Sequence, residues 1–167
     1  GGLPPLTDNV RPADDDNPNG YYEDERVAKL RDGDTEWVAE ARGRALKVIS
    51  AHLPHLPAQH GYRVIFMNRA MAEVLASQKK MLIRRGEDPD KTSDEEMARH
   101  FEEHIRWVND WAAAQDNIHM LRVDFGRLLV DPVPIIEEIV RFLDRPLDAA
   151  GMASVIDPSV RRHGEGC

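Results

Sequence analysis

The sequence has very little cysteine, no long apolar segment and no glycine-rich phosphate loop. Its 167 residues include one cysteine, Cys167, which excludes a disulfide-stapled scaffold and favours a reducing compartment, the cytoplasm. No apolar run reaches the roughly 18 residues that a membrane span needs. Hydrophobic residues nevertheless make up 41% of the chain, which is enough to build the core of a single domain over residues 1–167.

Positive charge is also scarce. The chain has 22 lysines and arginines against 30 aspartates and glutamates, so its formal net charge is -8. This balance argues against generic binding to nucleic acid or to an anionic membrane, although a local basic pocket can exist in an acidic protein. Arg161 and Arg162 near the end form one basic cluster. This pair is either an unstructured tail or an additional phosphate clamp.

Three short apolar runs predict the strands of the fold. They cover residues 45–50, 62–67 and 120–125, and helical patterns separate the second from the third. Strands of this kind, apolar on both faces and separated by helices, are typical of a mostly parallel sheet with helices on its faces. Three strands are few for such a sheet. Paired glycines often follow the end of a helix, so Gly1-Gly2 indicates that the chain is a fragment lacking a preceding element.

Apolar spacing predicts three longer helical segments and three shorter ones. The helix over 94–113 carries a capping-box signature, because Ser93 is followed by Glu96. The other longer segments are 71–85 and 131–143, and 148–155 is a last short helix. The other short helical stretches are expected near 24–30 and 35–42.

The pair Arg69 and Ser77 is the strongest candidate binding constellation. In open α/β sheets, ligands bind beyond the carboxyl ends of the strands, and Arg69 follows the 62–67 strand directly. The next helix presents backbone N–H groups to an anion, the Arg adds a bidentate fork, and Ser77 adds a hydroxyl. The alternative is a surface arginine and an unliganded serine on a helix face.

Histidines supply two further hypotheses. His52 follows the 45–50 strand, where a general base would suit an active site, although a loop histidine bonded to backbone explains it equally. His100 and His104 fit the H-x-x-E-H spelling of the inverted zinc peptidases. Because this helix is rich in charge and such short matches arise by chance, we predict no metal site there.

The order of motifs resembles the bacterial sulfotransferase family, a branch of the P-loop sulfotransferases. Residues 17–23 (NPNGYYE) look like its NP-x-GYYE segment, and residues 47–54 (KVISAHLP) are similar to the K-T-H-L-P strand and loop of eukaryotic relatives. Residues 63–77 look like the 3′-phosphate segment, in which an arginine precedes a serine by eight positions. The remaining similar pieces are residues 123–132 (VDFGRLLVDP), 142–148 (FLDRPLD) and 155–159 (VIDPS).

The resemblance implies an α/β fold of the P-loop kinase-like type whose first, P-loop strand is missing. It also implies the cosubstrate 3′-phosphoadenosine 5′-phosphosulfate (PAPS) and sulfuryl transfer to a small-molecule or glycan acceptor bearing a hydroxyl or amine. Arg69 and Ser77 would bind the 3′-phosphate, with Arg161 and Arg162 as an additional clamp. His52 would be the catalytic base, and residues 1–23 the loop region on the acceptor side.

The sequence departs from the family's motifs at two places, and these departures leave a second class of function open. Ser50 stands where the eukaryotic relatives have the lysine of K-T-H-L-P, and Lys47 lies three positions earlier. The loop that grips the 5′-phosphosulfate is absent from the 167 residues. The sequence therefore predicts either a sulfotransferase fragment that is inactive by itself or a non-catalytic nucleotide-binding or protein-interaction domain of the same fold.

Overall fold

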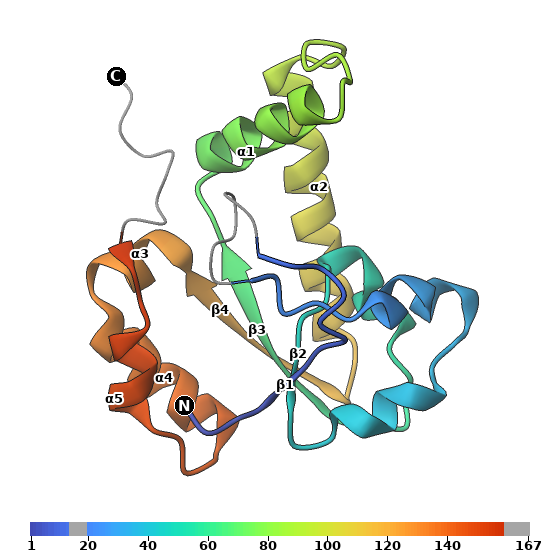
Figure 1. Cartoon of the computed structure of the whole chain (residues 1–167). Helices are drawn as coiled ribbons and strands as arrows, with labels where there is room; N and C mark the ends of the chain where they lie inside the picture. Colours follow the sequence, from blue (N-terminus) through green and yellow to red (C-terminus); the bar gives the residue numbers. More distant parts are fainter. Residues whose placement is uncertain (14–19, 159–167) are drawn as a thin grey trace. The chain divides into compact units, whose positions relative to one another are not determined.

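The computed structural model describes residues 1–13 and 20–158 (Figure 1). These residues form two compact units. Within the described residues, the N-terminal unit comprises Gly2–Tyr62 with Gln115–Asn117, and the C-terminal unit comprises Gly1, Arg63–Ala114 and residues 118–158. Compact units within one chain need not fold separately, so the expectation of a single domain stays a prediction.

The N-terminal unit is built on a very small sheet and three 3₁₀ helices. Strand β1 (Pro5–Leu6) pairs in parallel with β2 (Ala45–Leu46). The helices are η1 (Glu25–Asp32), η2 (Glu36–Ala41) and η3 (Ser50–His55). Gly33 ends η1 in the left-handed region, with φ 84°, which glycine adopts without steric cost. Five buried side chains form the core: Leu6, Val27, Leu30, Trp37 and Val38.

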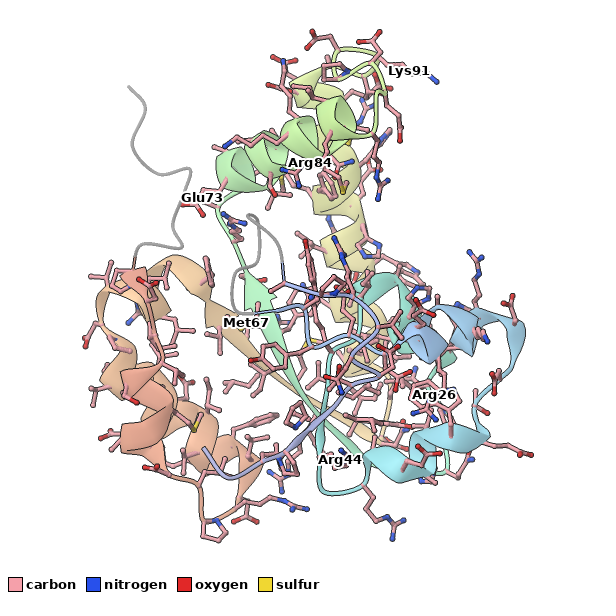
Figure 2. All side chains as sticks on the ribbon, in the orientation of Figure 1. Arg26, Arg44, Met67, Glu73, Arg84 and Lys91 are labelled. Atoms are coloured by element: carbon pink, nitrogen blue, oxygen red, sulfur yellow. The ribbon has the colours of Figure 1, made fainter. Side chains whose placement is uncertain are left out.

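A buried carboxylate holds the start of η1. The Asp24 side chain is 1% exposed, and its oxygens accept bonds from the backbone N–H, Nε and Nη2 of Arg26 at 2.8–3.0 Å. Arg26, which Figure 2 labels, also stacks over Trp37, with its guanidinium carbon 4.6 Å from the ring centroid. The hydrogen bonds from Arg26 hold the pKa of Asp24 below its ordinary value.

We predict that Asp24→Asn lowers the free energy of unfolding by about 1–2 kcal/mol at pH 7, the range for a charge-assisted bond. Asparagine still caps a helix, so the loss reports the charge. Because the folded pKa is depressed, the charge stabilises fully above the ordinary value of about 3.9 and is lost as pH falls through the folded pKa. Denaturant unfolding at pH 7 and near pH 2.5 should therefore show that the difference in unfolding free energy between the wild type and Asp24→Asn becomes smaller in acid. An equal difference at both pH values would contradict a stabilising role for the Asp24 charge.

The C-terminal unit is built on β3 (Tyr62–Asn68) and β4 (Ile118–Asp124), which form a second two-stranded sheet. The Tyr62 N–H donates to the Asn117 carbonyl at 2.8 Å, so the strands start side by side and run in parallel. Their carboxyl ends consequently meet at one edge. The five α helices of this unit are α1 (Met71–Arg84), α2 (Asp94–Ala113), α3 (Phe125–Val130), α4 (Pro132–Leu143) and α5 (Ala149–Ser154).

Helices cover both faces of β4. Val123 and Leu121 pack with Ile136 and its neighbours on α4, while the Arg122 Nε between them donates to the Asn109 Oδ1 of α2 at 2.9 Å. Successive strand side chains point to opposite faces, so α2 and α4 lie on opposite sides of the strand. Figure 1 shows α4 and α5 on one side of β3 and β4 and α2 on the other, whereas α1 lies beyond the tip of β3.

The mixed α/β class and the principal helices of the C-terminal unit are confirmed, but the predicted single sheet is wrong for the described residues. The strand predicted over 45–50 pairs only at Ala45–Leu46, and Ser50 already begins η3. In the register of β1 and β2, residues 47–50 would pair with residues 7–10, but the Asp8 N–H donates to the Glu23 carbonyl at 3.2 Å and Asn9 lies in the left-handed region, with φ 58°. Ile49 is consequently 63% exposed instead of buried in a sheet.

Candidate functional site

The carboxyl ends of β3 and β4 bring together two residues that are far apart in the sequence. Arg69 leaves β3 immediately before α1, and Phe125 leaves β4 as the first residue of α3. The guanidinium carbon of Arg69 lies 5.4 Å from the centroid of the Phe125 ring, within cation–π range. Arg69 therefore lies at the carboxyl end of β3, which is the position that the sequence predicted.

One edge of the Arg69 guanidinium is already bonded. Its Nε donates to the Glu73 Oε2 at 2.9 Å, one helical turn away. The terminal nitrogens, Nη1 and Nη2, have no partner among the residues that the structure describes. The Arg69 side chain is 29% exposed, so this pair of donors is accessible to an anion. Two parallel N–H groups of one guanidinium match two oxygens of a phosphate or sulfate.

Glu73 was not among the predicted site residues. It is the only fully buried residue of α1, with 4% of its surface exposed. A buried carboxylate is costly unless it is paired, and Arg69 supplies the countercharge. The signal in the sequence is the spacing of four between Arg69 and Glu73, which places opposite charges one turn apart at the start of a helix.

Ser77 lies on α1, one further turn beyond Glu73, and is exposed. No hydrogen bond joins it to Arg69 within the described part of the chain. With a rise of about 1.5 Å per residue, Ser77 lies roughly 9 Å along the helix from Met71. An anion shared by Arg69 and Ser77 would have to reach from the start of α1 to its second turn. The structure does not bring the two side chains together.

The start of α1 adds backbone donors near Arg69. The N-cap residue is Ala70, which has no side-chain oxygen to cap the first turn. The N–H groups at the beginning of the helix therefore keep the partial positive charge that favours an anion. On this side of the unit, a hollow of about 360 Å³ lies beyond β4, lined by Asp124, Gly126, Arg127, Val130 and Asp131. Arg127 was also missing from the predicted set.

His52, the predicted base, lies in η3 of the N-terminal unit, whereas Arg69 belongs to the C-terminal unit. Its Nδ1 is buried and has no hydrogen-bond partner among the described residues. A histidine that accepts a proton at Nε2 carries N–H groups on both nitrogens. The residues described here supply no acceptor that would orient the His52 ring or stabilise that imidazolium.

A second hollow, of about 260 Å³, lies in the N-terminal unit between residues 7–13 and 20–23. Its charged groups bond to one another. The Glu23 carboxylate accepts from Lys47 at 2.9 Å and from Arg11 at 3.4 Å, and Arg11 lies 3.3 Å from the centroid of the Tyr21 ring. Partial burial alone would raise the pKa of Glu23, but the hydrogen bonds and charges of Lys47 and Arg11 lower it below its ordinary value. Lys47 is thus engaged in holding this loop.

Two other sequence hypotheses concern metal and the chain end. Within residues 1–13 and 20–158, no group of three or more His, Cys, Asp or Glu side chains could hold a metal ion. His104 instead stacks on Trp107, with ring centroids 6.1 Å apart. Arg161 and Arg162 lie outside the described residues, as do residues 14–19 of the predicted acceptor-side loop.

Comparison of the chain with protein-family models, with curated proteins and with solved structures gives no match. None of the helices in the described ranges is both long enough and apolar enough to span a membrane.

Proposed function

We propose that this chain is a sulfotransferase-family protein that binds PAPS and its product adenosine 3′,5′-bisphosphate. The observation that carries the proposal is the accessible pair of terminal nitrogens on Arg69, at the carboxyl edge of β3 and next to a helix start without a side-chain cap. Its support from the sequence is the order of motifs, above all the arginine and serine eight positions apart. We further propose that β3 and β4 are strands of a P-loop kinase-like sheet.

The residues present fit an anionic ligand. Arg69 would bind the 3′-phosphate of the nucleotide through its terminal nitrogens, and the first N–H groups of α1 would add donors. Ser77 lies further along α1, so it would contact only the part of the same ligand that lies farthest from Arg69. PAPS, when bound, supplies the sulfuryl group that passes to a hydroxyl or amine acceptor. His52 would take the proton that the acceptor loses.

A second candidate function is a nucleotide-binding or protein-interaction domain of the same fold without catalysis. Two observations favour it. The 167 residues contain no glycine-rich loop for the 5′-phosphosulfate, and the described residues give His52 no orienting partner. Both candidates predict binding at Arg69 when the ligand carries a 3′-phosphate, and they differ in sulfuryl transfer.

We expect calorimetry to detect binding of adenosine 3′,5′-bisphosphate and weaker binding of adenosine 5′-phosphate, which lacks the 3′-phosphate. Arg69→Lys should lower the first affinity about 10- to 100-fold, because lysine keeps the charge opposite Glu73 but cannot form two parallel bonds. Ser77→Ala should cost at most about tenfold, the range of one neutral hydrogen bond. Equal affinities of the wild-type chain for both nucleotides would remove the 3′-phosphate site from Arg69.

A further inference from the structure

Glu73 occupies an unusual place for a carboxylate next to a proposed phosphate site. It is buried in the first turn of α1, where Figure 2 labels it beside the point at which the chain leaves β3. A negative charge here repels a phosphate dianion as well as attracting Arg69. At an effective dielectric constant near 20, charge interactions over such short distances are substantial, so this repulsion needs a compensating benefit.

The benefit lies in how Glu73 contacts Arg69. Its Oε2 accepts the Nε–H of Arg69 at 2.9 Å, and the Nη1 and Nη2 of Arg69 have no partner in the described residues. The ring of Phe125 lies 5.4 Å from the guanidinium carbon and restricts the group from another side. Arginine has several rotatable bonds, and a side chain that is already fixed loses less conformational entropy when it binds a ligand.

We propose that Glu73 is a positioning residue that holds Arg69 by its Nε, so that the two terminal nitrogens form a preorganised fork for the 3′-phosphate. This inference rests on the proposed function and deepens it. Phe125 completes the arrangement from the start of α3, because its ring faces the guanidinium. Glu73 itself does not touch the ligand and acts only through Arg69.

Two variants of Glu73 separate the effect of its hydrogen bond to Arg69 from the effect of its negative charge. Glu73→Gln and Glu73→Ala both remove the negative charge, but the glutamine oxygen can still accept the Nε–H bond. Calorimetry with adenosine 3′,5′-bisphosphate should find Glu73→Gln within about threefold of the wild type or tighter, because a repulsive charge is gone. Glu73→Ala should bind about tenfold more weakly than Glu73→Gln, since Arg69 must then be ordered by the ligand.

A matched control is present on α4. Glu137 and Arg141 form another pair four residues apart, with 3.9 Å between Nη1 and Oε2, and both side chains are largely exposed. Glu137→Gln and Glu137→Ala should leave the affinity unchanged. Adenosine 5′-phosphate is the control ligand, because Glu73→Ala should narrow the preference for the 3′-phosphorylated nucleotide. A general loss of folding would weaken the binding of both nucleotides equally, and that result would contradict the positioning role.

A spectroscopic readout tests the holding of Arg69 directly. In a ¹⁵N–¹H spectrum, a hydrogen-bonded arginine Nε–H exchanges slowly with water, so the Arg69 signal should persist in the wild type and in Glu73→Gln and disappear in Glu73→Ala. Equal affinities of Glu73→Ala and Glu73→Gln, with a wild type that still prefers the 3′-phosphate, would overturn the positioning role alone. A wild type that binds neither nucleotide would overturn the proposed function and this inference with it.

Discussion

Arg69→Ala should lower the free energy of unfolding at pH 7 by about 3 kcal/mol, as measured by denaturant unfolding. The variant leaves Glu73, whose side chain is 6% exposed, without the guanidinium that pairs with it. Removing one partner of a buried ion pair typically costs about 3–5 kcal/mol, and the lower end applies because the Arg69 side chain is 29% exposed. For a chain of this size, about 3 kcal/mol corresponds to a fall in Tm of roughly 6–12 °C.

The double variant Arg69→Ala/Glu73→Ala is the control for this loss. It removes the buried charge together with its partner, so it should be more stable than Arg69→Ala. A double variant that is as unstable as the single one would mean that the side chain of Arg69 stabilises the unit by packing and not by neutralising Glu73.

The 167-residue chain should bind adenosine 3′,5′-bisphosphate but should not transfer sulfuryl groups measurably. Catalysis needs stabilisation at the reacting centre, and the chain contains no glycine-rich loop to hold the 5′-phosphosulfate, where charge develops. One well-placed donor is typically worth about 10²–10³ in rate, so the loss of several reduces transfer to background. The measurement is transfer of radiolabelled sulfate from PAPS to a panel of alcohols and amines, against a protein-free blank.

Transfer well above the blank would contradict this expectation and would show that residues of this chain hold the reacting end. His52 would then be tested directly. If it is the base, His52→Ala should lower turnover by about 10²–10⁴. His55→Ala is the matched control, because His55 lies on the same 3₁₀ helix and is exposed. Equal turnover of the two variants would remove the catalytic role from His52.

The sequence by itself determined the elements that depend on local interactions. The helix predicted over 94–113 matches α2, and the Glu96 N–H bonds to the Ser93 hydroxyl oxygen at 3.2 Å. The helix predicted over 71–85 matches α1, and the strand predicted over 62–67 matches β3 with one more residue. Helical hydrogen bonds and caps join residues a few positions apart, so their pattern is present in the sequence itself.

The sequence also placed Arg69 at the end of a strand, but only the tertiary structure decided what surrounds it. Phe125 reaches Arg69 because β3 and β4 pair in parallel, and no local pattern encodes that pairing. The strand predicted over 45–50 is shortened for the same kind of reason, because its length depends on the partner β1, and the chain after Leu6 bonds to the Glu23 carbonyl instead of continuing beside residues 47–50. The burial of Glu73 likewise depends on packing around α1, which turns a polar residue of the first turn into the partner of the proposed phosphate-binding arginine.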